Sequence, residues 1–214
     1  MHRRRFLLAL PFAWTAQAQA QNLPLPLASP VDAVHVYIVP TDDISEATAG
    51  SIARHLSSES GLWIKSTPWT PAEGLEAFAG TNQYAAEDFF PIPQRLSRIL
   101  RDVSPRTYFI VLTTRDINAR NRNFRFQYSY HNPMANTSVL SVARLRYQID
   151  GTPAPVDLVV TRVTKMLMRI VGEMRMGWKR NGDPTDLMYA PIMSVEDIDR
   201  MDLSHTIRQR KEAL

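Results

Sequence analysis

One long segment near the carboxyl terminus constrains the fold more than any other part of the chain. Residues 156–178 have the pattern of a single helix with apolar side chains nearly all round it. These side chains are Leu158, Val159, Val160, Val163, Met166, Leu167, Met168, Ile170, Val171, Met174 and Met176. Such a helix is stable in water only when other elements cover most of its surface. The segment therefore predicts a central helix that the rest of the domain surrounds.

The chain before this helix alternates between strand patterns and helix patterns. Apolar, β-branched runs predict buried strands at residues 34–39, 62–65 and 108–112. Between the first two, helical spacing predicts a helix that follows capping residues 41–43 and stops at Gly61. A second helix is predicted at residues 82–103. It is interrupted at Pro91 and Pro93. After the interruption, three side chains are expected to point inward: Leu96, Ile99 and Leu100.

An alternating segment follows. Phe124, Phe126, Tyr128 and Tyr130 are separated by single polar residues, which is typical of a half-exposed strand near a sheet edge. Residues 137–145 are predicted to form the neighbouring strand. After the central helix, a short capped helix is predicted at residues 194–201. Together the elements predict a single α/β (α+β) domain, with a twisted mixed sheet packed on helices.

The composition supports one globular domain and excludes cysteine chemistry. The chain has 214 residues, of which 44% are hydrophobic, enough for one core of ordinary size. It has no cysteine, which excludes disulfides, thiolate zinc sites and a thiol nucleophile. None of its five histidines lies within three to five residues of another, so the sequence lacks the spacing of a helical or hairpin metal site.

The first twenty residues have the pattern of a cleaved export signal. Arg3-Arg4-Arg5 precede a short apolar run, and small residues allow cleavage after Ala18 or Ala20. An arginine pair before Phe6-Leu7 fits the twin-arginine route, and an ordinary secretory signal is the alternative. We therefore expect a protein that is exported to the periplasm or secreted by a bacterium.

The remaining boundaries and the charge follow from this signal. We predict a Pro-rich tether at residues 21–31, a domain at 32–202 and a polar tail at 203–214. The whole chain carries a formal net charge of +4, and removal of the three signal arginines leaves 22 basic and 21 acidic residues. This balance gives no support to a nucleic-acid partner. No stretch after residue 21 is apolar enough to span a membrane.

The order of the elements, together with several short motifs, resembles the archaemetzincins, a group of metzincin zinc peptidases. The matching segments cover most of residues 34–201. They are Gly61-Leu62-Trp63, residues 82–86 (NQYAA), 111–116 (VLTTRD), 123–126 (NFRF) and 139–145 (VLSVARL). The resemblance implies a metzincin-like single domain with a central helix and a Met-turn-like segment at Met188.

The active segment of that family reads H-E-x-x-H-x-x-G-x-x-H and is followed by the Met turn. Alignment on Gly177 and Met188 places Ile170, Met174 and Arg180 at the three zinc-ligand positions. The position of the catalytic Glu falls on Val171. No shift of the alignment brings a histidine to a ligand position.

These residue types do not fit the family's metal. Zinc sites need nitrogen, sulfur or oxygen donors, which Ile170 lacks, and a thioether such as that of Met174 does not replace an imidazole in such a site. Arg180 carries a permanent positive charge. We therefore expect no metal, no cofactor and no peptidase activity. Arg180 is expected either to pair with Glu173 or Asp183, or to lie solvated in the loop.

Three functions remain open. The first is a pseudopeptidase that binds a peptide or an envelope protein. In the family, the peptide adds as a strand at a sheet edge, which implies contacts from Phe124, Phe126, Tyr128, Val139 and Ser141. The second is a hydrolase with a rebuilt site, using Glu173, Arg180 and Tyr189, or a metal held by scattered groups such as His131. The third is a structural accessory protein of the envelope.

Two other clusters have alternative interpretations. Arg115, Arg120, Arg122 and Arg125 could receive an anion or an acidic partner, or they could form a solvated loop. The methionines of the central helix could form a metal or partner surface, or they could fill the core. Paired carboxylates at 42–43 and 87–88 are interpreted as helix caps.

Overall fold

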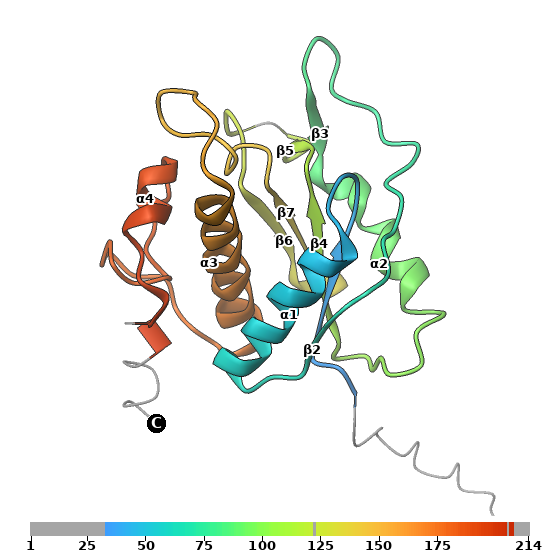
Figure 1. Cartoon of the computed structure of the whole chain (residues 1–214). Coiled ribbons are helices and arrows are strands. Elements are labelled where there is room, and N and C mark those ends of the chain that lie inside the picture. Colours follow the sequence, from blue (N-terminus) through green and yellow to red (C-terminus); the bar gives the residue numbers. More distant parts are fainter. Residues whose placement is uncertain (1–32, 122, 205, 208–214) are drawn as a thin grey trace, which may run out of the picture.

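A five-stranded sheet separates two layers of helices in the computed structural model (Figure 1). Four of its strands are parallel to one another, and the fifth, at one edge, is antiparallel to its neighbour. In spatial order the strands are β2 (Ile64–Ser66), β1 (Val36–Pro40), β4 (Tyr108–Thr113), β7 (Thr137–Ser141) and β6 (Ser129–Asn132). A separate two-stranded parallel sheet is formed by β3 (Gln83–Ala85) and β5 (Asp116–Asn118). The predicted mixed sheet is confirmed.

The structure describes residues 33–121, 123–204 and 206–207. The predicted export signal, the tether at 21–31, Arg122 and the end of the predicted tail lie outside these residues. Within them, no helix is long and apolar enough to cross a bilayer.

The two faces of the sheet belong to two cores. Val36, Ile38 and Ile110 point to the layer formed by α1 (Glu46–Ser60) and α3 (Val156–Arg175). The alternate residues of the same strands point to the opposite layer, with the 3-10 helix η1 (Ala86–Phe89) and α2 (Pro91–Leu96). A strand that is covered on both faces needs apolar residues at every position. This is why the runs at 34–39 and 108–112 were recognisable as strands from the sequence.

The carboxyl end of α1 was predicted correctly, whereas its amino end was not. Gly61 ends the helix in the left-handed conformation, with φ of 71°, as predicted. The N-cap, however, is Ser45, whose Oγ accepts from the Thr48 amide at 3.1 Å. The predicted caps at 41–43 are therefore wrong. The Asp42 carboxylate instead accepts from Arg115 Nε at 3.0 Å and from the hydroxyl of Thr113.

The predicted helix at 82–103 is only partly correct. Its first part forms β3 and η1, and the helix begins at Pro91 instead of breaking there. The first turn of a helix has amides without intrahelical acceptors, so Pro91 and Pro93 fit there without loss of a hydrogen bond. Leu96 is buried as predicted, whereas Ile99 follows the end of the helix and is 73% exposed.

The edge strand begins five residues later and ends two residues later than the alternation predicted. The backbone of the predicted segment is bonded to another part of the fold: the Phe124 carbonyl accepts from Asn118 Nδ2 at 2.7 Å, and the Gln127 amide donates to the Ile117 carbonyl at 3.1 Å. These bonds to β5 and its end hold residues 124–127 away from the main sheet. The ladder with β7 covers Ser129–Asn132, and the Tyr128 carbonyl just before it accepts from the Ser141 amide of β7.

The carboxyl-terminal elements pack on the outer side of α3 (Figure 1). The short helix α4 (Val195–Arg200) begins where Asp197 Oδ2 accepts from the Ser194 amide at 3.0 Å, and this confirms the predicted capped helix. The domain extends beyond the predicted boundary at 202, because Thr206 and Ile207 are buried. Thr206 Oγ1 accepts from the Leu187 amide at 2.9 Å and so connects this segment to the residue before Met188.

Candidate functional site

The carboxyl-terminal half of α3 carries the positions at which the resemblance would place a metal. Ile170 is 1% exposed, and Met174, one turn later, is partly buried against the same core. The helix ends at Arg175, and Gly177 has φ of 71°, a conformation that favours glycine. The chain thus bends where the aligned motif has its glycine.

Behind this bend, Arg180 turns back to the helix. Its Nε and Nη2 donate to the two carboxylate oxygens of Glu173, at 2.9 and 3.2 Å. The side chain of Arg180 is 52% exposed and that of Glu173 is 21% exposed, so the pair lies at the surface. Of the two alternatives from the sequence, pairing with Glu173 is therefore confirmed. Solvent screens a pair of this kind, which contributes less than about 1 kcal/mol to stability.

A second guanidinium, which the sequence analysis did not single out, is buried at the same end of α3. Arg169 is 6% exposed and its Nη1 donates to the Leu187 carbonyl. Burial lowers the pKa of Arg169 to about 10, and the nearby charge of Arg180 acts in the same direction, while Glu173 opposes it. Arg169 thus joins α3 to the segment that contains Met188. The sequence signal was the seven-residue spacing of Arg162 and Arg169, which puts both arginines close to one side of the helix among apolar neighbours.

The segment around Met188 is held by its backbone. Met188 is fully buried, and its amide donates to Asp186 Oδ1 at 2.7 Å. Its carbonyl accepts from the Asn181 amide at 3.0 Å. Tyr189, a candidate catalytic residue, is partly buried against the core that Met188 shares. Met166 and Met168 are also fully enclosed, which favours the interpretation of the helix methionines as core residues.

The edge strand contributes a histidine to the same region. His131 Nδ1 lies 2.8 Å from Ser138 Oγ on β7, and Ser138 Oγ lies 2.8 Å from the Tyr108 hydroxyl on β4. This chain of polar groups crosses three neighbouring strands on the face that α3 covers. Burial is the largest influence on His131 and lowers its pKa to about 4; Glu173 opposes this change, while Arg180 and Arg169 add to it. His131 is therefore neutral at pH 7.

We expect the buried neutral state of His131 to make the protein less stable in mild acid. The unfolded chain binds a proton near pH 6.5, whereas folded His131 binds one only near pH 4. Between these values the unfolded state binds more protons, so the free energy of unfolding falls as the pH falls. His131→Asn should remove about 3 kcal/mol of this loss, as measured by urea unfolding at several pH values from 7 to 4. Equal pH dependence in both proteins would contradict the prediction.

The residues at the aligned positions do not fit zinc. Ile170 has no donor atom, and the guanidinium of Arg180 is cationic and already bonded to Glu173. Across residues 33–121, 123–204 and 206–207, no group of three His, Asp or Glu side chains is arranged to hold a metal ion. His131, proposed from the sequence as a scattered ligand, has hydroxyl neighbours instead: Ser138 at Nδ1 and Ser129 Oγ 3.2 Å from Nε2.

The residues predicted to line a peptide edge are separated by the fold. Val139 and Ser141 lie on β7, which pairs with β4 on one side and β6 on the other, so their prediction as edge residues is wrong. Phe124 is 61% exposed but precedes the strand. Phe126 and Tyr128 pack edge to face, with ring centroids 5.3 Å apart, and Tyr128 is buried. Among the described residues, the sheet has two edge strands, and the one beside β7 is β6 (Ser129–Asn132).

The predicted arginine cluster is also dispersed. Arg115 pairs with Asp42 and lies over the ring of Tyr84, while Arg120 pairs with Asp88. The carboxylate of Glu87 accepts from the Arg120 amide at 3.1 Å. These contacts tie loops of this domain together and give no support to an anion site.

No family model and no curated protein sequence matches the chain, but its fold is similar to that of three solved structures. One is a zinc-dependent peptidase from Methanocorpusculum labreanum, with 16% identity and a TM-score of 0.64 over 78% of this chain and 94% of that one. Two are archaemetzincins. The protein from Archaeoglobus fulgidus, complexed with malonate, has 24% identity and a TM-score of 0.57 over 78% and 92% of the two chains.

The archaemetzincin from Methanopyrus kandleri has 19% identity and a TM-score of 0.56 over 87% of this chain and 99% of its own. At such identities the similarity establishes the fold, whereas activity depends on the residues of the site. The sheet, the helix layers and the bend after α3 therefore form a domain with the archaemetzincin-like fold.

Proposed function

We propose that the protein binds extended peptide segments at the free edge of β6 and does not hydrolyse them. The observation that carries this proposal is the combination of an open antiparallel edge with a neighbouring helix end that offers a guanidinium–carboxylate pair in place of metal ligands. Binding by strand addition needs main-chain groups and no metal.

The direction of the main-chain groups on β6 can be derived from the ladder. The Ser141 amide donates to the Tyr128 carbonyl at 2.8 Å, which fixes residue 128 as inward-facing. In an antiparallel pair the inward and outward residues alternate. The amide and carbonyl groups of Ser129 and His131 therefore point away from β7, toward the position of an added strand.

The side chains at this edge differ between the two faces. Ser129 and His131 lie on the α3 face, near the Glu173–Arg180 pair, while Tyr130 stacks on Phe90 with ring centroids 5.9 Å apart. An added peptide would place alternate side chains on these two faces. Both carboxylate oxygens of Glu173 accept hydrogen bonds from Arg180, which orients the carboxylate toward the guanidinium.

The proposed place of action is outside the cytoplasm. This part of the proposal is supported by the basic and apolar pattern of residues 1–20. Peptides or envelope proteins are the proposed partners.

Proline at position 129 provides the test. Ser129→Pro removes an outward-facing amide and leaves the ladder with β7 intact. We expect it to weaken binding of a decapeptide, selected from a random phage-displayed library, about tenfold or more in calorimetry. Ser129→Ala, the matched control, keeps the amide and should bind within about twofold of the wild type. Equal affinity of the proline variant would refute binding at this edge.

The non-catalytic part of the proposal is tested separately. The same peptide is incubated with the protein and one equivalent of Zn²⁺, and its mass is followed over a day. An unchanged peptide is expected. Cleavage that a chelator abolishes would show that a metal site exists in spite of the residues at 170, 174 and 180. Cleavage that survives the chelator but is lost in Glu173→Gln would show a rebuilt hydrolase.

A further inference from the structure

A cavity of about 450 Å³ lies between α1 and α3, on the other side of α3 from the peptide edge. It lies at the carboxyl ends of two neighbouring strands. Leu112 is near the end of β4, Thr114 follows β4, and Val142 follows β7. β1 is joined to β2 through α1 on one face, and the chain returns to β4 through α2 on the opposite face. This reversal makes the carboxyl end of the sheet a topological switch point, the position at which open α/β sheets bind ligands.

The walls of the cavity are apolar. Side chains from α1, the sheet and α3 form them: Ile44, Ile52, Leu112, Val142, Val159 and Val163. A volume of this size is within the range of small-molecule sites, and walls of this kind favour a ligand with an apolar body. A second cavity of about 450 Å³ lies between the same helices and shares Ile52 and Val160, but most of its other lining residues are polar, so the apolar space is that of the first cavity.

Two charged residues line the cavity, Asp43 and Arg146, and both are exposed. Asp43 precedes the amino end of α1, where a negative charge is stabilised by the helix dipole. Arg146 has no such partner: its guanidinium makes no ion pair or hydrogen bond with any other residue that the structure describes. The guanidinium of Arg146 at this apolar cavity can therefore pair with the anionic group of a ligand.

The surface beside the cavity is also apolar. Val156 is 77% exposed, and Val160, which lines both cavities, is 38% exposed. Tyr147 and Ile149, in the hairpin that begins at Arg146, are 45% and 74% exposed. Of these side chains, Val156 and Val160 line the cavity itself, and exposed apolar side chains at a concavity are typical of a binding site for an apolar ligand.

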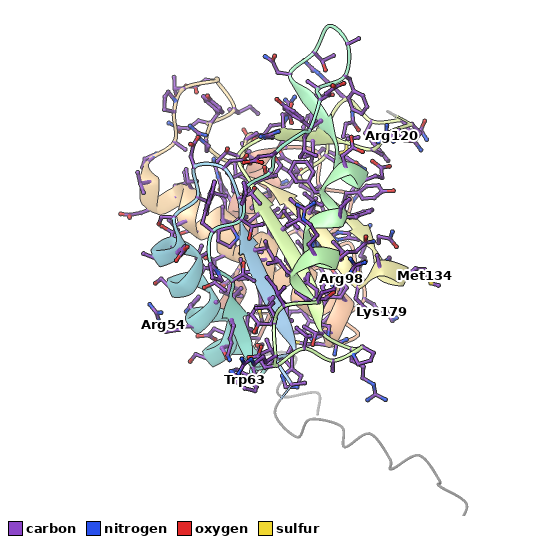
Figure 2. All side chains as sticks on the ribbon, turned by 90° about the vertical axis from the view of Figure 1, so that its right-hand side faces the viewer. Arg54, Trp63, Arg98, Arg120, Met134 and Lys179 are labelled. Atoms are coloured by element: carbon purple, nitrogen blue, oxygen red, sulfur yellow. The ribbon has the colours of Figure 1, made fainter. Side chains whose placement is uncertain are left out.

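We propose that this cavity binds a free, medium-chain carboxylate: the hydrocarbon chain lies between α1 and α3, and the carboxylate pairs with Arg146. The site is separate from the proposed peptide edge. Arg54 on α1 and Met134, which follows β6, project on opposite sides of the molecule in Figure 2.

Decanoate and decanol, which share a chain and differ in charge, test the proposal with the full chain by calorimetry. Arg146→Gln should weaken decanoate binding about tenfold and leave decanol binding unchanged, because only decanoate forms the charge-assisted hydrogen bond. Asp43→Asn should strengthen decanoate binding about twofold, since it removes a repulsive charge. The two charge variants are thus expected to act in opposite directions.

The position of the hydrocarbon chain is tested by filling the cavity. Val160→Trp should abolish binding of both ligands, and Ala154→Trp, which fills the cavity from the hairpin, serves if the first variant does not fold. Ile99→Trp adds the same indole to an exposed position after α2 and should change neither affinity. No decanoate binding to the wild type, equal weakening of both ligands by Arg146→Gln, or undiminished binding to both tryptophan variants in the cavity would overturn the proposal.

Discussion

Arg162→Met is expected to lower the free energy of unfolding by about 3 kcal/mol, the largest effect of any single charge removal in this domain. The Arg162 side chain is 2% exposed, although it belongs to the segment whose pattern is apolar nearly all round. Its Nε and Nη2 donate to the two carboxylate oxygens of Asp199, at 2.7 and 2.6 Å. Its Nη1 donates to the carbonyls of Leu145 and Tyr147, at 3.0 and 2.8 Å.

The sign of this effect follows from the partners that would remain. Methionine retains most of the apolar length of arginine, but it leaves two carbonyl oxygens and the Asp199 carboxylate without their donor. A buried polar group that loses its partner costs about 1–3 kcal/mol. The hydrogen bonds to Asp199 raise the pKa of Arg162, which shows that the folded state favours its charge despite burial.

A double-mutant cycle separates the pair from the carbonyl contacts. Asp199→Asn removes only the charge of the partner and should cost less than Arg162→Met, and the two changes together should cost less than the sum. Arg120→Met is the matched control: Arg120 pairs with Asp88, but its side chain is 61% exposed, so the loss should stay below about 0.5 kcal/mol. The free energies come from urea unfolding. An Arg162→Met loss as small as that of the control would contradict the prediction.

Gly172→Ala should destabilise the protein by about 2–3 kcal/mol, although alanine is the better helix former. Gly172 lies in α3, and a Cβ atom there would approach Cε3, Cδ2 and Cζ3 of Trp178 to 2.2, 2.7 and 2.9 Å. The indole is 9% exposed and the Trp178 amide donates to the Gly172 carbonyl at 2.9 Å. To make room for the alanine methyl group, the Trp178 ring would have to move, and the backbone bend at Gly177 would have to move with it.

The same substitution elsewhere gives the control. Gly50 lies in α1, where a Cβ would meet Ser66 Oγ at 3.4 Å and Arg54 Nη1 at 3.6 Å, both ordinary contacts. Gly50→Ala should therefore stabilise the protein by about 0.5–1 kcal/mol through helix propensity alone. In a Gly172→Ala/Trp178→Leu protein, the cost of the alanine should largely disappear when it is compared with Trp178→Leu alone. A stabilising Gly172→Ala would show that the indole does not hold the bend.

The candidate site is cationic at the position where the related fold would hold a metal. Arg180 pairs with Glu173 at the surface, and Arg169 is buried against the carbonyl of Leu187. The second contact joins the long helix to the Met188 segment, and a buried hydrogen bond from a charged donor contributes more than a screened surface pair. Arg169 is therefore the guanidinium with the greater structural role, whereas the sequence directed attention to Arg180.

Much of the fold could be predicted because burial leaves a local record. The strand at 108–112 is apolar at every covered position, most covered positions of the central helix are apolar, and Gly61 ends α1 because a residue without a Cβ atom adopts the left-handed conformation without strain. The residue types at 170, 174 and 180 are likewise facts of the sequence, whereas their assignment to the zinc-ligand positions is what the resemblance implies.

Only the tertiary structure decided which distant groups meet. The edge strand was predicted at 124–130 and is found at 129–132. The backbone of the earlier residues is instead hydrogen-bonded to Ile117 and Asn118 of β5. His131 joined the site because β6 pairs with β7, and the buried charge of Arg162 is met by a carboxylate 37 residues away. The periodicity of a sequence predicts whether a side chain is buried. The hydrogen-bond partner of a buried polar group, however, comes from a distant part of the chain, and no local sequence pattern identifies it.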